Sequence, residues 1–271
     1  MVAQMHRMDA LANNLANVDL NGYKEDMSVH KAFPELLLRR MNDDGVINLG
    51  FASIDVGPVV GKLGTGVELN ESYTIFTQGA LKQTDNPFDL ALEGQGFLTV
   101  QVGEEERYTR NGAFLLSDDG YLVTKDGHRV VGENGPIRLK KNNFAIDQDG
   151  VIWQNSEYAG DEARLVSLEE NEWESIERVD RLKIVDFKRT RYLKKQGNSF
   201  WMDTRESGPA QIMEFGGRPK VRQGFLEGSN VNPVQQMVQM IEVNRTYEAN
   251  QRIIQSHDSM LGKLINEAIR V

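Results

Sequence analysis

Residues 237–268 read MVQMIEVNRTYEANQRIIQSHDSMLGKLINEA, and an apolar side chain recurs in them at every seventh position. This column consists of Met240, Tyr247, Ile254, Leu261 and Ala268. The spacing keeps one face of a helix turned toward a partner helix, as in a coiled coil. The stretch therefore predicts a C-terminal helix within residues 226–271 that needs another helix to pack against.

An ordinary surface helix on a globular core is the alternative interpretation of this stripe. Two features favour a bundle that several helices share. The stripe runs for about 30 residues with no internal glycine before Gly262, which is long for a globular protein. Its seam also holds polar residues that a partly hydrated bundle tolerates better than a core does, namely Asn244, Asn250, Gln251, His257 and Asp258.

The N-terminus carries a similar pattern. Met1, Met8 and Leu15 lie seven residues apart, and Leu11 and Val18 form a second pair with the same spacing. This pattern predicts an N-terminal helix in residues 1–32. Because the middle of the chain offers no such helix, the simplest mate of each terminal helix is the other terminus or the same segment of a neighbouring copy.

The middle of the chain is punctuated by dipeptides that suit tight turns. Asp119-Gly120, Asp126-Gly127, Asn134-Gly135 and Asp149-Gly150 can supply the positive φ that β-hairpin turns require. The segments 97–102, 121–124 and 128–131 are rich in β-branched and aromatic residues. We therefore expect a β-rich domain of mainly antiparallel strands over residues 73–225.

Residues 33–72 are expected to connect the first helix to this domain. Their second half is rich in glycine and favours neither a helix nor a core, so it predicts an extended connector with a hairpin in it. The whole chain is thus predicted to be α+β. A mainly antiparallel β central domain is inserted between N- and C-terminal coiled-coil-like helices, which together form a helical core domain.

Composition limits the function classes. The chain has 271 residues, and its 39% hydrophobic content is enough to bury a core. A net charge of −9 argues against a general binder of nucleic acid or anionic membranes, which needs a basic surface. The sequence has no cysteine, so disulfides and thiolate metal sites are excluded. It also contains neither an apolar run of about 18 residues nor a cleavable signal peptide pattern.

Several apparent chemical motifs do not meet the requirements of their chemistry. The run from Gly57 to Lys62 resembles a phosphate loop, but its glycines are one residue too close and Leu63 replaces the Ser or Thr that would hold magnesium. The run from Asp147 to Gly150 lacks the further acidic ligands of a calcium loop. The four histidines are too scattered to form a metal cluster. We therefore predict no catalytic, cofactor-binding or metal site, and no cofactor.

An acidic stretch is followed directly by a basic one. The acidic residues are Asp161, Glu162, Glu169, Glu170, Glu172, Glu174, Glu177 and Asp180. The basic residues are Arg181, Lys183, Lys188, Arg189, Arg191, Lys194 and Lys195. Solvated strand faces are one explanation, and a polar contact between opposite patches of two subunits is the other.

Ordered motifs along the chain resemble those of the bacterial flagellar rod and hook proteins. The N-terminal motif is MDALANNLANV at residues 8–18 with NGYK at 21–24, and the C-terminal motif begins EGSNVNPV at 227–234. Central motifs are YTIFTQGAL at 73–81, DNPFDLAL at 85–92, GQGFL at 94–98 and YTRNG at 108–112. The chain length and the sequence Gly135-Pro136-Ile137 resemble those of the proximal or distal rod proteins more than those of the longer hook protein.

The resemblance implies a structural subunit of the flagellar basal-body rod, exported without a cleavable signal peptide and not an enzyme. It would assemble through its terminal helices with copies of itself and with other rod and hook proteins into a hollow periplasmic tube, which transmits torque and passes exported subunits. The flagellar type III export apparatus would be a further partner, and no nucleic acid binding or membrane insertion is implied. A heterologous contact that does not close on itself builds such an open tube.

The residues expected at the assembly interface come from both ends of the chain. They are Met8, Leu11, Asn13, Asn14, Leu15, Asn17, Val18, Met240, Tyr247, Ile254, Leu261 and Leu264. The three asparagines are expected to fix the register between chains by hydrogen bonds, or else to form the polar solvent face of a single helix.

Two rival functions have distinct signatures. An enzyme requires a pocket lined by carboxylates or histidines, whereas a surface- or carbohydrate-binding β-domain with a helical stalk requires exposed aromatic platforms at Trp153, Trp173 or Trp201. The chain also departs from the family at its start. Related chains carry about a dozen further residues before the position of Met1, and the helical pattern here begins without an N-cap residue, so we expect a trimmed or misplaced start.

Overall fold

The computed structural model describes residues 2–39, 46–49, 52–55, 59–140, 144–155, 176–197, 199–213 and 217–268. The chain divides into two compact units. Unit 1 comprises residues 1–11, 27–72 and 238–271, and unit 2 comprises residues 12–26 and 73–237. The segment 73–225, expected from the sequence to be β-rich, lies within unit 2.

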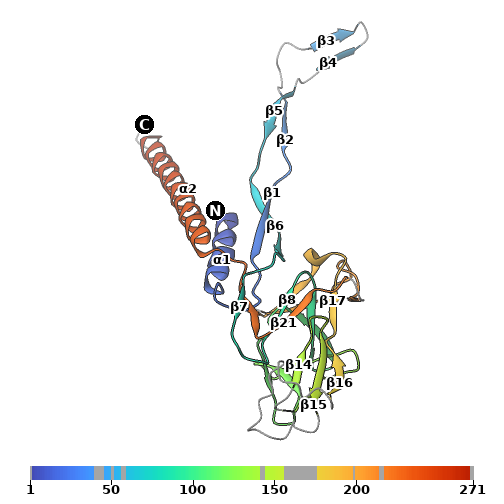
Figure 1. The fold of residues 1–271 in the computed structure, drawn as a ribbon. Helices are drawn as coiled ribbons and strands as arrows, with labels where there is room; N and C mark the ends of the chain where they lie inside the picture. Colours follow the sequence, from blue (N-terminus) through green and yellow to red (C-terminus); the bar gives the residue numbers. More distant parts are fainter. Residues whose placement is uncertain are drawn as a thin grey trace. The chain divides into compact units, whose positions relative to one another are not determined.

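Two α-helices occupy the two ends of the described chain (Figure 1). Helix α1 spans Val2–Ala16 and helix α2 spans Pro233–Ala268. Asn232 caps α2, because its Oδ1 accepts hydrogen bonds from the backbone N–H groups of Val234 and Gln235 at 3.1 and 3.3 Å. Pro233 then occupies the first helical position, where its missing N–H costs nothing. Neither helix has the length and apolar character needed to span a membrane.

Helix α1 is shorter than the N-terminal segment 1–32 expected to be helical, because it ends at Ala16 and residues 26–32 form strand β1. The asparagines near its end explain why the helix ends there, since their side chains form hydrogen bonds with backbone groups that compete with those of the helix. Gly22 then adopts a φ of 69°, and an added Cβ there would collide with the backbone of Arg110 and Asn111. The chain therefore turns tightly before it enters the strand.

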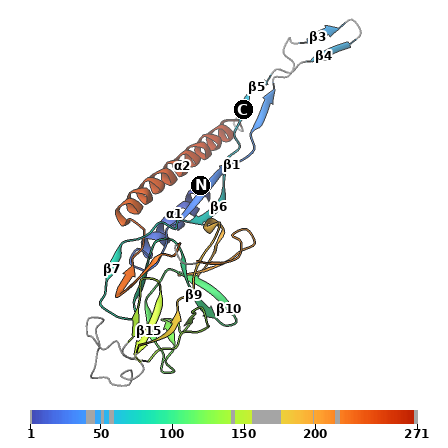
Figure 2. The ribbon, with the colours of Figure 1, turned by 45° about the vertical axis from the view of Figure 1, so that its right-hand side comes forward.

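Six described strands between residues 26 and 74 pair two by two into a ribbon, which lies almost wholly in unit 1 (Figure 2). Its strands pair in nested order, β1 with β6, β2 with β5 and β3 with β4. Their bounds are Asp26–Ala32 for β1, Leu36–Arg39 for β2, Val46–Leu49 for β3, Ala52–Asp55 for β4, Val59–Leu63 for β5 and Val67–Thr74 for β6. Strands β3 and β4 pair with each other inside the segment 33–72 that was expected to be a connector, and its role as a connector stays a prediction.

Unit 2 is built from short strands, and the pairings recorded for them are antiparallel. They are β7 (Leu81–Gln83), β8 (Leu90–Glu93), β9 (Phe97–Val102), β10 (Glu105–Thr109), β11 (Phe114–Leu116), β12 (Leu122–Thr124), β13 (Arg129–Val130), β14 (Phe144–Ile146), β15 (Val151–Asn155), β16 (Ile176–Arg181), β17 (Ile184–Asp186), β18 (Lys194–Gln196), β19 (Phe200–Met202), β20 (Gln211–Ile212), β21 (Lys220–Gln223) and β22 (Phe225–Glu227). A short 3₁₀ helix, η2 (Thr190–Tyr192), precedes β18.

The largest sheet of the described strands has nine members. Its main order is β11-β12-β13-β9-β10-β19-β18, and β17 joins it through β9 and carries β20. A three-stranded sheet of β14, β15 and β16 and the pairs β21–β8 and β22–β7 complete unit 2. The pair β22–β7 brings the segment just before α2 onto the β-rich unit.

Two clusters of buried side chains form the core of unit 2. The larger one is aliphatic and contains Leu90, Leu98, Val100 and Ile184 among others. The smaller one is aromatic, with Phe97, Tyr108, Phe187 and Trp201 in edge-on or tilted ring contacts. Strand β9 serves both clusters, because successive side chains point to opposite faces of a strand: Phe97 lies in the aromatic cluster, and Leu98 and Val100 lie in the aliphatic one.

The predicted fold class is confirmed at the level of a mixed fold with mostly antiparallel strands and a helix at each end. The four turn dipeptides are also confirmed, because Gly120, Gly127, Gly135 and Gly150 all have positive φ. The coiled-coil character of the helices stays a prediction.

Candidate assembly interface

The C-terminal half of α2 has no packing partner among the described residues. Ile254, Leu261 and Leu264, three of the residues expected at the interface, are 47%, 56% and 62% exposed. Met240 and Tyr247, nearer the start of the helix, are half-buried. Every residue from 251 to 266 is exposed. An apolar stripe exposed to water over so many turns is typical of surfaces that bind other molecules.

The stripe is wider than the seven-residue column predicted. Ile253, Met260 and Ile265 are also more than half exposed. With Ile254, Leu261 and Leu264 they recur at intervals of three, four and seven residues, which places them on one broad face of a helix. The sequence signal for them was present, but a search for a seven-residue column alone does not find it.

The residues expected at the interface near the N-terminus are more enclosed. Leu11, Asn14 and Asn17 are buried within the described chain, whereas Asn13 is exposed. Met8, Leu15 and Val18 are half-buried. The part that each of them takes in contacts between subunits stays a prediction.

The asparagine side chains form hydrogen bonds within the chain. Asn14 pairs with the backbone of Asp26, donating to its carbonyl and accepting from its N–H, both at 2.9 Å. Asn17 donates to the carbonyl of Asn13 at 2.7 Å, and the hydroxyl of Tyr23 donates to Asn13 Oδ1 at 2.7 Å. These amides therefore fix the chain where α1 turns into β1.

A buried ion cluster lies in unit 2, where the segments next to the two helices meet. Glu227 accepts from Lys24 Nζ through Oε1 at 2.6 Å, and Arg110 Nη1 approaches Oε2 at 3.4 Å. The three side chains are between 0% and 4% exposed. The same carboxylate accepts from the N–H of Gly79 at 3.0 Å, and Lys24 also donates to the carbonyl of Thr77 at 2.7 Å.

Burial is the main influence on the pKa values of both cations in this cluster. It lowers the pKa of the Lys24 ammonium below its usual range, and the carboxylate of Glu227 opposes the shift. Burial likewise lowers the pKa of the Arg110 guanidinium, again against the effect of Glu227. The carboxylate of Glu227 therefore stabilises the charged forms of both Lys24 and Arg110, because the protein interior solvates ions poorly.

Further polar contacts extend this junction toward the start of α2. Asn230 accepts from the N–H of Glu25 at 2.8 Å and donates to the carbonyl of Ile75 at 2.9 Å. Gln236, in the first turns of α2, donates to Glu25 Oε1 at 2.8 Å. The segments that follow α1 and precede α2 are therefore held together on the β-rich unit.

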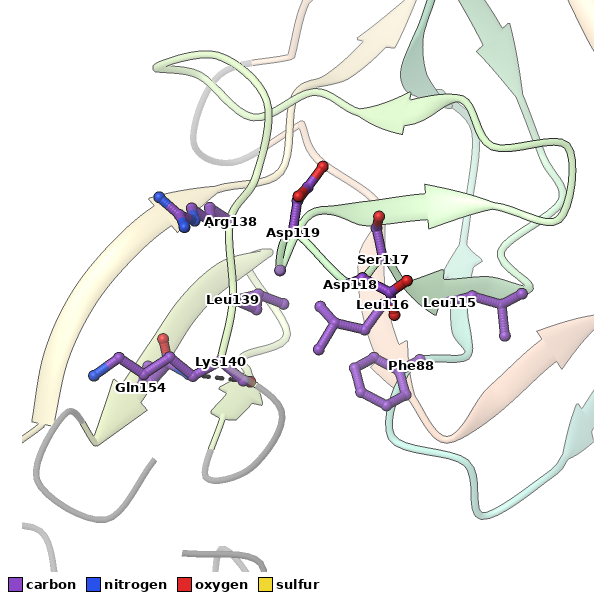
Figure 3. Close-up of a pocket in the computed structure, with 11 residues that line it drawn as sticks. Phe88, Leu115, Leu116, Ser117, Asp118, Asp119, Arg138, Leu139, Lys140 and Gln154 are labelled. Atoms are coloured by element: carbon purple, nitrogen blue, oxygen red, sulfur yellow. Dashed lines mark hydrogen bonds between the residues drawn. The ribbon is translucent and has the colours of Figure 1, made fainter. Parts of the chain in front are cut away.

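The signatures of the rival functions can be checked on the described chain. An open hollow of about 1130 Å³ has Leu115–Asp119 on one side and Arg138–Lys140 on the other, as Figure 3 shows. It has no histidine in its lining, and its two carboxylates, Asp118 and Asp119, are exposed to solvent. Among the described residues no group of acidic or histidine side chains is arranged to hold a metal ion.

The aromatic platforms expected of a carbohydrate-binding domain are not found at the two tryptophans that the structure describes. Trp201 is fully buried in the aromatic cluster, and Trp153 is half-buried in β15. Trp173 lies outside the described residues.

Two models of protein families match the chain. The model described as "Flagellar basal body rod FlgEFG protein C-terminal" matches residues 222–267, which include α2 except for its last residue. The model described as "Flagellar hook protein FlgE/F/G D1 domain" matches residues 91–154, within unit 2.

Individual relatives match over nearly the whole length. The chain is 33% identical to the flagellar basal-body rod protein FlgG of Buchnera aphidicola subsp. Schizaphis graminum, covering 97% of this chain and 94% of the relative. It is 31% identical to FlgG of Agrobacterium fabrum, covering 96% and 93%. It is 30% identical to the flagellar hook-basal body complex protein FlhO of Bacillus subtilis, covering 98% and 94%.

Proposed function

The chain belongs to the family of bacterial flagellar basal-body rod proteins, and we propose that its terminal helices assemble it into a hollow helical tube. As a member of this family it is a structural subunit of the rod and not an enzyme. It assembles with other rod proteins in the flagellar basal body. The proposal concerns the surfaces that form the tube, the periplasmic position of the tube and the export of the subunit without a cleavable signal peptide.

The exposed apolar stripe of α2 is the observation that carries the proposal. Ile253, Ile254, Leu261, Leu264 and Ile265 are between 47% and 62% exposed in a single subunit. Covering a side chain of this size stabilises an interface by roughly 1.5–3 kcal/mol if burial is complete. Several such residues on one face are enough to drive association, and a helix is the partner that their spacing fits.

The tube would be open-ended because the two subunits in each contact use different surfaces. α2 offers an exposed apolar face over residues 251–266, whereas the side chains of α1 are more enclosed, with Leu11 buried and Leu15 half-buried. When the two partners use different patches, the contact is heterologous, and a rotation that does not close gives an open helical polymer. A layer of such helices around a central axis leaves a channel, through which the export apparatus would pass later subunits.

The ribbon of residues 26–74 supplies a second surface for assembly. Leu36, Leu37 and Leu38 follow one another in β2 and are 57%, 57% and 47% exposed. Successive side chains of a strand point to opposite faces, so both faces of the ribbon are apolar here. A two-stranded ribbon gains little stability on its own. Contacts with neighbouring subunits would cover these leucines and stiffen the tube against torque.

The isolated subunit is expected to be a monomer in which the C-terminal half of α2 is poorly protected from hydrogen exchange. Ordering the backbone costs about 1–2 kcal/mol per residue, and residues 251–266 bury little area in one chain to offset it. Their amides should exchange orders of magnitude faster than those of β9 in the core, and should become protected in assembled rods. Strong protection of residues 251–266 in a verified monomer contradicts the proposal.

Cross-linking tests the helical contact directly, because the natural chain has no cysteine. The double variant Leu15→Cys/Leu261→Cys is expected to form covalent multimers in assembled rods and none in dilute subunits. A cysteine at the exposed Lys125 in unit 2 serves as the control for random collisions. The absence of multimers across a scan of every position in both helices counts against a shared helical layer.

A further inference from the structure

Two segments from opposite ends of the chain meet inside unit 2. Residues 20–26 follow α1 and residues 227–236 include the start of α2, and both ranges belong to this unit. The N–H of Gly22 donates to the carbonyl of Glu227 at 2.7 Å, and the buried ammonium of Lys24 donates to the carboxylate of Glu227 at 2.6 Å. Lys24 and Glu227 lie 203 residues apart in the sequence. We call the first range the N-side segment, the second range the C-side segment, and the two together the terminal clasp.

Further polar groups join the two segments. The N–H of Glu25 donates to Asn230 Oδ1 at 2.8 Å, and Gln236 Nε2 donates to Glu25 Oε1 at 2.8 Å. Gln236 is 2% exposed, and its Oε1 also accepts from Asn14 Nδ2 at 3.4 Å. Loss of one segment would leave buried polar groups of the other unpaired, which costs more than the hydrogen bond itself contributes. The two segments are therefore coupled.

Residues 74–80 contact both sides of the terminal clasp. Ile75 donates its N–H to a carbonyl of the N-side segment at 2.8 Å, and its own carbonyl accepts from Asn230 Nδ2 at 2.9 Å. The backbones approach closely here, because a Cβ added at Gly79 would lie 2.1 Å from the carbonyl oxygen of Gly228. The C-side segment thus forms part of the surface on which the N-side segment docks.

The two sides of the clasp are placed by different interactions. Strand β22 pairs with β7, which sets Glu227 opposite Leu81, so the fold of unit 2 itself brings the C-side segment into position. The N-side segment has no strand pairing before Asp26, where β1 begins. Side chains and isolated backbone hydrogen bonds hold it instead. The C-side segment is therefore expected to dock first.

The buried ion cluster makes docking of the N-side segment conditional. Lys24 and Arg110 are both enclosed, and the carboxylate of Glu227 contacts both of them. Burial lowers the pKa of the Lys24 ammonium, Glu227 opposes this shift, and Arg110 adds to it. Without Glu227 in place, docking would bury the Lys24 ammonium beside a second cation and without an anion, which is strongly unfavourable. The N-side segment is therefore excluded from its site until the C-side segment supplies the carboxylate.

We propose that the terminal clasp makes the order of the N-side segment depend on the C-terminus. Residues 20–26 dock only after residues 227–236 lie in place on the same unit 2. A chain whose C-terminal part is missing or undocked therefore keeps its N-side segment free. The consequence for assembly rests on the proposed function: only a clasped subunit joins the rod, because an unclasped one would have to order both segments during association.

Hydrogen exchange of the dilute full-length subunit tests the coupling. Gln236→Ala removes a side chain that binds Glu25, and it is expected to speed the exchange of amides in residues 20–26 roughly tenfold, the effect of leaving a buried partner unpaired. Amides of β9 should keep their natural rates, because the core of unit 2 is untouched. The matched control is Gln235→Ala at the exposed neighbouring position, which should change neither set. Unchanged rates in residues 20–26 of Gln236→Ala, or equal acceleration in β9, overturn the inference.

A second pair of variants tests the electrostatic condition. Glu227→Gln should free the N-side segment, so that residues 20–26 exchange faster than in Gln236→Ala. Lys24→Met/Glu227→Gln should restore part of their protection although the carboxylate is still absent, because the docked segment no longer carries a cation toward Arg110. If the double variant exchanges as fast as Glu227→Gln alone, the charge of Lys24 does not control docking and the inference fails.

Rod assembly tests the consequence, in a strain that lacks its own copy of the gene. Lys24→Glu places a second carboxylate beside Glu227, so it should open the clasp while the pair of Glu227 with Arg110 remains. Residues 20–26 should then exchange like an unstructured peptide, whereas Gly228 stays protected by its own backbone hydrogen bond. Complete rods, counted by electron microscopy, should fall in proportion to the fraction of clasped subunits. The matched control is Lys24→Met, which adds no charge at the same buried position and should build rods in nearly natural number.

Each outcome of this experiment decides the inference. Rods in natural number from Lys24→Glu, or protected residues 20–26 in that variant, overturn it. If Lys24→Met loses rods as completely as Lys24→Glu, the buried lysine serves assembly in another way, and the inference is overturned as well. If the natural chain itself restores no rods to the deletion strain, the proposed function fails, whereas the exchange rates of the dilute subunit still decide whether the clasp exists.

Discussion

Ile254→Asp is expected to abolish rod assembly and motility while leaving the melting transition of the soluble subunit unchanged. Ile254 is 47% exposed and lies in the part of α2 that packs against nothing in the described chain, so the variant removes no contact from the folded subunit. In a packed interface the new carboxylate would be buried without a partner, which costs several kcal/mol after relaxation. Swimming in soft agar and counts of rods by electron microscopy measure the first outcome, and thermal unfolding measures the second.

Ser259→Asp is the matched control for this variant. Ser259 is exposed and lies five residues further along α2, which places it about 140° around the helix from Ile254. The same charge on that face should leave motility nearly intact. If Ile254→Asp unfolds unit 2, the terminal helix is part of one cooperative core. If Ile254→Asp cells swim normally, the stripe of α2 is not an assembly element.

Glu227→Gln is expected to lower the stability of the soluble subunit more than any single change in the terminal helices. The variant leaves Lys24 and Arg110 buried without a negative partner, and breaking a buried pair in this way costs about 3–5 kcal/mol. For a domain of this size the loss corresponds to a fall in melting temperature on the order of 10 °C. Near-UV circular dichroism of the buried Trp201 reports the transition of unit 2.

The order of effects within the ion cluster makes this prediction specific. Lys24→Met should cost less than Glu227→Gln, because the carboxylate keeps Arg110 and the N–H of Gly79 as partners. The double variant Lys24→Met/Glu227→Gln should be less destabilised than the sum of the two, because only one unpaired cation remains buried. Additive losses, or a milder effect of Glu227→Gln than of Lys24→Met, would show that the carboxylate does not hold the cluster together.

The terminal helix and the turns of the β-rich unit could be predicted because their signals are local. The apolar column from Met240 to Ala268 and the four turn dipeptides act within a few residues of one another, so spacing alone identifies them. The end of α1 could not be predicted from local spacing. Asn14 stops the helix by bonding to Asp26, and a partner twelve residues away leaves no periodic trace in the sequence.

The ion cluster could not be predicted from the sequence, although all its members were visible in it. Lys24, Arg110 and Glu227 lie in three of the motifs that resemble the rod and hook family. Motif matching shows that such residues occur together, but it does not show that they touch. Their contact depends on the pairing of β22 with β7 and on the tight turn at Gly22, both of which are settled by long-range packing.

The leucine-rich ribbon also constrains how the free subunit must be handled by the cell. Leu36 to Leu38 present apolar side chains on both faces of a two-stranded element, and such an element has backbone groups left over at both edges. A register slip by one residue exchanges one leucine for another, so the pattern does little to reject wrong pairings. If neighbouring subunits cover these leucines in the rod, as proposed, the same apolar surface exposes the free subunit to aggregation.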